Sequence, residues 1–273
     1  MERPSINELG AELTHTTASQ AAIALCLPFL AIASYFLFAF SGAWIGAVLS
    51  IMFLSFISYG STSHDLVHAN LGLPKRVNDF FLLLIEMLCL RSGTAYRATH
   101  LHHHKNFPHF DDVEAASAES LMQSLLNAPL LQFKLWLWCW HNCQSKRAML
   151  AVEAAWFVFF VCLSLSLLPH NWVLAIYTAL VIGGTWVFPI ATVYVPHDPN
   201  GKDTLTQTRR FRGPFFSAIA FEHLYHLEHH LYPFVPRHHW KQLAHRLDPY
   251  LDAHAIPAIT FAQLMSMNKT RQR

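Results

Sequence analysis

The chain has 273 residues, of which 53% are hydrophobic and only 13% are charged, whereas a soluble globular protein usually carries about 25% charged residues. This composition argues against a soluble enzyme, and a formal net charge of +2 argues against a nucleic-acid-binding protein. Histidine is unusually common, because its 19 copies equal the lysines and arginines combined.

Two long stretches without Asp, Glu, Lys or Arg locate the predicted membrane spans. They run from Leu13 to His64 and from Ala154 to His197. A single crossing needs about 20 apolar residues, so each stretch has room for two helices. Turn residues at 41–42 and 169–171 divide the stretches. We therefore predict an all-α membrane protein with four transmembrane helices in two hairpins, at about 21–40, 43–59, 151–168 and 172–195.

The distribution of basic residues predicts the orientation in the membrane. All lysines and arginines lie outside the two hairpins and their tips. Basic residues favour the cytoplasmic side, so both termini and the segments 60–150 and 196–273 are expected there, as one cap. Within the cap, the apolar stretches 80–90 and 121–140 contain Glu86 and Lys134, and we expect them to form buried or interfacial helices along the membrane surface. No second domain is evident in residues 1–273.

Three clusters of histidine have the spacing of metal ligands. They are His64 and His68 in HDLVH, His100, His103 and His104 in HLHHH, and His226, His229 and His230 in HLEHH. Positions i, i+3 and i+4 share one face of a helix, so each cluster can aim two or three imidazoles at one point. Eight nitrogen ligands are too many for one tetrahedral zinc, which favours two metal ions. Imidazole suits iron, copper, zinc and nickel.

Residues beside the clusters supply further candidates. His197 directly follows the fourth span and is predicted to be a ninth ligand, ahead of His223. Metal-bound imidazoles commonly donate their second N–H to a carboxylate, a role open to Asp65 and Glu228, although each could equally be a solvated acid. Asp111 and Asp112 could instead pair with arginine or lysine. His102 and His109 are expected outside the ligand set.

The three histidine boxes, together with the continuation His230-Leu-Tyr-Pro-Phe-Val-Pro236, resemble those of the membrane fatty acid desaturase superfamily. This superfamily includes acyl-lipid desaturases, acyl hydroxylases and bacterial carotenoid ketolases. The resemblance implies four transmembrane helices beneath a cytoplasmic helical cap that holds two iron ions. It implies no catalytic residue beyond the metal ligands, which would be His64, His68, His100, His103, His104, His197, His226, His229 and His230.

The function that the resemblance implies is O2-dependent oxidation of unactivated C–H bonds in a long lipid chain. Desaturation of an acyl chain is the main hypothesis. The alternative is a carotenoid ketolase or hydroxylase, which the phrase from Tyr225 to Pro233 also resembles. In either case an apolar substrate would enter from the bilayer.

Electrons are expected from a separate ferredoxin or cytochrome. The sequence has no G-x-G-x-x-G fingerprint, no P-loop and no cysteine set for an iron–sulfur cluster. An acidic donor could dock on basic residues of the cap, which could equally contact anionic lipid headgroups. These basic residues are Arg209, Arg210, Arg212, Arg237 and Lys241.

Two other classes of protein fit less well. A metal transporter would carry polar groups along its spans, and the two stretches lack charge. An intramembrane zinc protease would need H-E-x-x-H, which does not occur.

Overall fold

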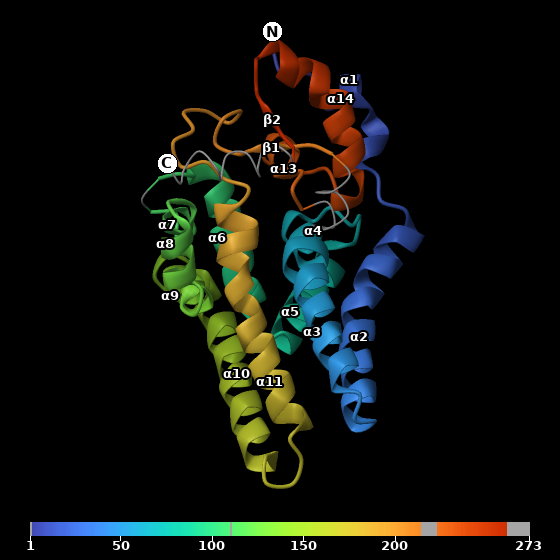
Figure 1. The fold of residues 1–273 in the computed structure, drawn as a ribbon, viewed down its shortest axis with the longest axis vertical. Coiled ribbons are helices and arrows are strands. Elements are labelled where there is room, and N and C mark those ends of the chain that lie inside the picture. The colour runs from blue at the N-terminus through green and yellow to red at the C-terminus, as the bar shows by residue number, and fades with distance from the viewer. Residues whose placement is uncertain (1, 110, 214–222, 261–273) are drawn as a thin grey trace.

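The computed structural model describes residues 2–109, 111–213 and 223–260, and this part of the chain is mostly helical (Figure 1). The α-helices are α1 Ile6–Leu9, α2 Ala18–Phe40, α3 Trp44–Ile57, α4 Ser63–His68, α5 Lys75–Leu88, α6 Gly93–Asn106, α7 Ala115–Ala118, α8 Leu121–Asn127, α9 Leu131–Asn142, α10 Arg147–Leu167, α11 Val173–Gly184, α13 His226–Leu231 and α14 Trp240–Ala253. Shorter 3-10 or π turns are η1 Ala11–Thr14, η2 Ser58–Thr62, η3 Gln144–Lys146, η4 Thr185–Val187, η5 Pro189–Tyr194 and η6 Arg237–His239. The parallel strands β1 Arg210–Phe211 and β2 Ala258–Ile259 form one short pair.

Four helices in the described residues are long and apolar enough to cross a membrane, which confirms the four predicted spans. They cover Ala11–Phe40, Trp44–His68, Gln144–Leu167 and Val173–Tyr194. The α-helical part of the first span is α2, which is capped at its N-terminus by the Thr17 hydroxyl, an acceptor for the Gln20 N–H. It ends at Phe40. Gly42 follows with a φ of 78°, a left-handed conformation that costs glycine little, so the chain reverses at the predicted turn.

The second span is longer than predicted. The π-helix η2 joins α3 to α4, so one helical column continues from Trp44 to His68 instead of ending at residue 59. Serine side chains do not end a helix when their hydroxyls donate to a carbonyl of the preceding turn. The Ser58 hydroxyl donates in this way to the Leu54 carbonyl at 2.7 Å. The first histidine box therefore lies on the end of an apolar helix.

The long helices pack against one another at one end of the molecule, with α2 against α3 and α10 against α11 (Figure 1). Helix α11 also contacts α2 and α3, and the buried Tyr35 hydroxyl donates to the Val173 carbonyl at 2.6 Å. Large apolar side chains such as Leu37, Ile45 and Leu165 remain exposed on the outer faces of these helices. An apolar exterior of this kind suits contact with lipid tails.

The remaining described elements gather at the opposite end from the turns that join the long helices (Figure 1). Both apolar stretches of this region are mostly helical, as expected: residues 80–88 lie in α5, and 121–140 is divided between α8 and α9. Helix α14 is amphipathic and buries Leu243 and Leu247 against Leu9 and Leu13 of the N-terminal turns. This packing holds the C-terminal elements above the ends of the spans.

Candidate metal centre

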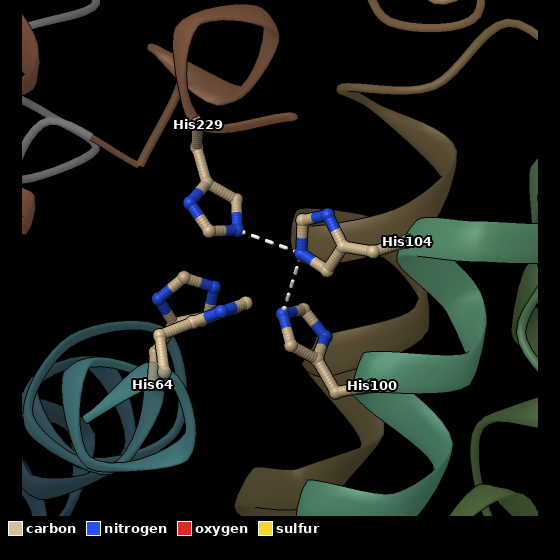
Figure 2. Close-up of side chains that lie close together, drawn as sticks. His64, His100, His104 and His229 are labelled. Carbon is tan, nitrogen blue, oxygen red and sulfur yellow. Dashed lines mark hydrogen bonds between the residues drawn. The ribbon is translucent and has the colours of Figure 1, made fainter. Parts of the chain in front are cut away.

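All nine histidines that the sequence singles out come together, in two groups among the described residues. Within each group, the candidate ligand atoms lie within 4.8 Å of one another. The first group is His64, His68, His100, His104 and His229, four of which Figure 2 labels. The second group is His103, His197, His226 and His230.

The two groups cut across the histidine boxes. Within α6, His100 and His104 belong to the first group, whereas His103 belongs to the second. Successive residues of a helix are about 100° apart around its axis, so neighbouring side chains diverge to different sides. Two imidazoles of the α6 box, His100 and His104, therefore aim at one point, as expected, and the third aims at the other group. Helix α13 repeats the division, with His229 in the first group and its neighbour His230 in the second.

The facing nitrogens have the spacing of ligands around one ion. In the first group, His104 Nε2 lies 2.8 Å from His229 Nε2 and 3.1 Å from His100 Nε2 (Figure 2). In the second, the Nε2 atoms of His230 and His226 lie 3.1 Å apart. Imidazole nitrogen binds a metal such as zinc at about 2.1 Å, so two ligands at right angles lie about 3.0 Å apart.

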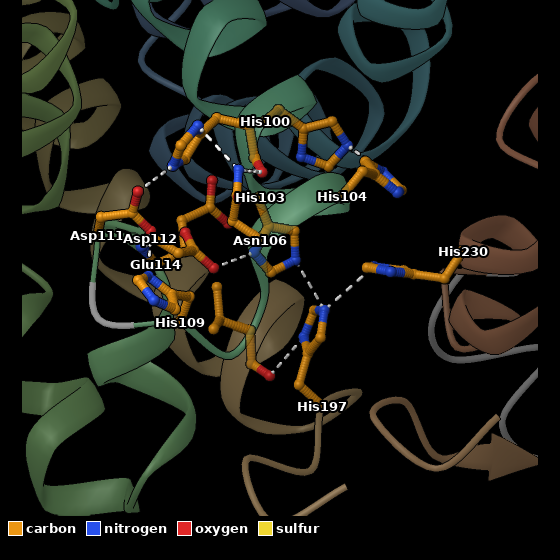
Figure 3. Close-up of polar contacts among 12 residues, drawn as sticks. His100, His103, His104, Asn106, His109, Asp111, Asp112, Glu114, His197 and His230 are labelled. Carbon is orange, nitrogen blue, oxygen red and sulfur yellow. Dashed lines mark hydrogen bonds and ion pairs between the residues drawn. The ribbon is translucent and has the colours of Figure 1, made fainter. Parts of the chain in front are cut away.

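Hydrogen bonding alone does not explain the short distances between the ring nitrogens of the second group. His197 Nδ1 donates to the Val193 carbonyl at 2.9 Å, and His103 Nδ1 donates to Asp112 Oδ2 at 2.7 Å (Figure 3). A neutral imidazole has one N–H, so the Nε2 atoms of His103 and His197 present lone pairs to each other at 2.9 Å. His197 Nε2 also lies 3.2 Å from His226 and from His230. A single proton could satisfy only one of these contacts, whereas a metal cation satisfies all of them.

The first group carries buried nitrogens that have no hydrogen-bond partner among the described residues. They include both ring nitrogens of His64 and Nε2 of His68. A buried polar atom without a partner is costly, and a bound cation would remove that cost. The donor set of both groups therefore fits metal ions.

Burial keeps most of these imidazoles in the neutral form that binds metal. It lowers the pKa of a set of histidines well below the usual range, and neighbouring histidines add to the effect. This set is His100, His104, His197, His226, His229 and His230. At His103 burial also opposes protonation, but the hydrogen bond and charge of Asp112 outweigh it and raise the pKa.

Among the described residues, the carboxylate that bonds to a candidate ligand is Asp112, and neither Asp65 nor Glu228, for which the sequence left this role open. Asp112 is buried and accepts the His103 N–H, instead of pairing with arginine or lysine. Asp65 is buried but accepts the backbone N–H of Arg237 at 3.0 Å. Glu228 is buried and pairs with Arg212, whose Nη2 lies 2.6 Å from Glu228 Oε1. Neither bonds to a candidate ligand, and neither is a solvated surface acid.

A cavity of about 20 Å³ adjoins both groups and is lined partly by residues that the sequence did not single out. Tyr59 and Gly60 come from η2, and Thr192 comes from η5, so both π-helices border it. Tyr96 and the buried Glu114 complete this wall. Tyr96 precedes His100 by one helical turn, and this spacing could have predicted that Tyr96 lies beside the candidate metal centre. No feature of the neighbouring sequence predicts that Glu114 lies there.

The other histidines near the boxes lie outside the two groups. His102 turns toward Trp138, with ring centroids 4.6 Å apart, and His109 bonds to Asp111. His223 lines the cavity beside Gly60, where an added Cβ would come within 2.3 Å of its ring.

Most of the basic residues proposed for donor docking have structural partners. Arg210 is 5% exposed and pairs with Asp248 and Asp252. Arg212 pairs with Asp248 and Glu228, and Arg209 donates to the carbonyls of Tyr194 and Val195. These three arginines hold the chain around the third histidine box together. Lys241 is exposed.

Comparison with known proteins yields one family. The family model described as fatty acid desaturase matches residues 39–262, which contain all nine grouped histidines. No curated protein matches the chain.

Proposed function

We propose that this chain, which belongs to the fatty acid desaturase family, is a membrane-bound oxidoreductase with a two-iron centre that desaturates a fatty acyl chain by means of O2. The observation that carries this proposal is the pair of histidine groups, whose nitrogens face one another at ligand spacing, with His64 and His68 on the end of an apolar helix. The family supports lipid oxidation and iron as the metal, and the division of the histidines into two groups supports two ions.

The two ions have separate sets of ligands in this proposal. The first would be held by His64, His68, His100, His104 and His229, and the second by His103, His197, His226 and His230. Two bound ferrous ions would supply the redox chemistry by which O2 is reduced and an unactivated C–H bond is oxidised. An all-histidine shell brings no negative charge, which suits a site close to lipid.

The chain's own residues position and shield the centre. Asp112 holds the His103 ring, and the Val193 carbonyl holds the His197 ring, each through its Nδ1. Trp240 is buried and packs against His229 and His64, with ring centroids 4.8 Å and 5.4 Å away. Burial of this kind excludes water, so side reactions at the centre are suppressed.

The proposed topology places the centre on the cytoplasmic side. The two hairpins would cross the membrane with their tips outside, and the rest of the chain would form one cytoplasmic cap. Lysines and arginines are absent from the hairpin tips, and Lys146 and Arg147 lie at the end of the third span that faces the cap. There the cap would meet a separate ferredoxin or cytochrome that supplies electrons. A tag inserted at 169–171 should be accessible only from outside sealed cells. Labelling of that tag from the cytoplasm would contradict this topology.

A carotenoid ketolase or hydroxylase is the second candidate, favoured by the phrase Tyr225-His226-Leu-Glu-His229-His230-Leu-Tyr-Pro233. The same centre could act on either substrate, because small differences in substrate position decide between loss of a second hydrogen and gain of oxygen.

A lipid mass profile tests the proposal. The chain is expressed in a host that makes fatty acids and β-carotene, with iron and a reductase system supplied. His229→Ala removes a proposed ligand, and His102→Ala is the matched control from a histidine box but outside both groups. We expect acyl chains lighter by two hydrogens with the wild type and His102→Ala, and none with His229→Ala.

Two other results would change the assignment. Carotenoids that gain oxygen, with unchanged acyl chains, would favour the second candidate. Unchanged lipids from a wild-type protein that carries iron would refute both.

A further inference from the structure

A second and larger cavity lies beside the long helices, away from the histidine groups. It measures about 360 Å³ and lies between α9, α10 and η4, within the size range of small-molecule sites. Aromatic side chains form much of its wall, including Phe133, Trp136 and Trp156. Val158 and Trp186 also line it and are 58% and 50% exposed, so the cavity opens on the apolar outer face of α10 and η4.

The charged groups in this cavity already have partners in the protein, whereas Nε2 of the lining residue Gln132 is buried without a hydrogen-bond partner among the described residues. Arg91 is the one cation among the described lining residues, and both Nε and Nη2 bond to the buried Glu86, at 2.7 and 2.8 Å. Glu153 accepts the Ser92 hydroxyl at 2.5 Å and the Thr94 backbone N–H at 3.1 Å. No lining cation is therefore available for a phosphate or a carboxylate, and the cavity favours an uncharged, apolar ligand.

A thin partition separates this outer cavity from the small cavity beside the histidines. Tyr59 lines the small cavity and stacks on Phe188, with ring centroids 4.1 Å apart. The Arg91 guanidinium lies over both rings, 5.3 Å from the Tyr59 centroid and 5.1 Å from that of Phe188. Arg91, which lines the outer cavity, therefore contacts Tyr59, which lines the small cavity beside the candidate metal centre.

The small cavity cannot hold a lipid by itself. At about 20 Å³ it accommodates about one water-sized group, whereas a long lipid has many carbons beyond the one that reacts. The rest of the substrate needs an apolar site close by that is reached from the bilayer.

We infer that the outer cavity binds an uncharged apolar segment of the lipid substrate, remote from the carbon that is oxidised. The inference rests on the proposed function, because it assigns the cavity to that substrate. The Tyr59–Phe188 stack beneath Arg91 would be the boundary that the chain passes on its way to the centre.

Photolabelling tests this site without requiring turnover. The probe is a diacylglycerol with a diazirine near the end of one acyl chain, added to the full chain in phosphatidylcholine vesicles. Ala154→Phe fills the cavity from its α10 wall, and Ala155→Phe is the matched control on the exposed neighbouring position. Val158→Phe fills the exposed mouth, and so tests the site even if Ala154→Phe does not fold. Labelling is read in the α9 peptide around Trp136.

We expect labelling of this peptide to fall about tenfold or more in Ala154→Phe and Val158→Phe, and to persist in Ala155→Phe. Equal labelling in all variants would overturn the inference. Equal labelling by a phosphatidylcholine that carries the same diazirine would also overturn it, because bulk lipid would then fill the cavity. His229→Ala should label like the wild type, so failure of the oxidation chemistry and failure of this site are distinguishable.

Discussion

Asp112 offers the sharpest test of how the protein tunes its candidate metal centre. Its Oδ2 accepts the His103 Nδ1–H at 2.7 Å, and both side chains are 1% exposed. Its Oδ1 accepts the Glu114 backbone N–H at 3.0 Å. Asp112→Asn keeps the shape and one oxygen acceptor but removes the negative charge. Because this charge raises the pKa of His103, the variant should make His103 Nε2 a weaker donor to a metal.

The expected effect is a loss of metal affinity at the second group alone. Removing the partner of a metal-bound imidazole typically lowers metal affinity by about 10- to 100-fold. That range corresponds to about 1.4 to 2.7 kcal/mol. The first group contains neither His103 nor any residue bonded to Asp112, so its affinity should be unchanged.

The assay is a competition titration of the purified protein with ferrous iron and a chelator. Asp111→Asn is the matched control, because Asp111 is 44% exposed and bonds to His109, outside both groups. We expect one weakened site in Asp112→Asn and two unchanged sites in Asp111→Asn. Equal affinities in the two variants would refute the role assigned to Asp112.

Three further perturbations have defined outcomes. Arg212→Leu leaves Glu228 buried without its cation and should lower the free energy of unfolding by about 3–5 kcal/mol. Adding Glu228→Leu to the same chain should restore part of that free energy. A denaturation experiment in which the double variant shows no recovery would contradict the pairing. Gly60→Ala places a Cβ 2.3 Å from the His223 ring, in the small cavity beside the histidine groups. Product formation should therefore fall while bound iron is retained. Full activity would contradict this cavity geometry. Burial lowers the pKa of six grouped histidines outside the spans, so the folded metal-free protein binds fewer protons than the unfolded chain. This stability is present above the usual histidine pKa of about 6.5 and is lost as the pH falls below it. Melting temperatures of the metal-free protein that match at pH 7.5 and 5.5 would contradict it.

The sequence predicted the parts of this protein that depend on local periodicity. Charge-free stretches located the four long helices, because helix length and side-chain polarity are local properties. Histidine spacing identified the nine grouped residues for the same reason. The second span was predicted too short, since the polar residues around Ser58 suggest an end, whereas η2 bonds them into a continuous helix.

Contacts between distant segments were not predictable in the same way. Glu228 lies between two histidines of its box, yet the fold brings Arg212 to it. Asp112 resembles its neighbour Asp111 in sequence, yet one is buried against His103 and the other is exposed. Such differences depend on how distant helices pack together, and this packing cannot be predicted from the residues next to Glu228 or Asp112 in the sequence.

The division of the second and third boxes between two groups leads to a final prediction. His103 and His104 are adjacent in α6 but face different groups, so removing one should leave the other group's ligands in place. We expect His103→Ala and His104→Ala each to retain about one tightly bound iron per chain, and the double variant to retain none. Iron analysis after gel filtration in chelator measures this. One iron retained by the double variant would mean that His103 and His104 hold the same ion, so that each box serves one ion. Loss of both ions from a single variant would mean that the two ions do not bind independently.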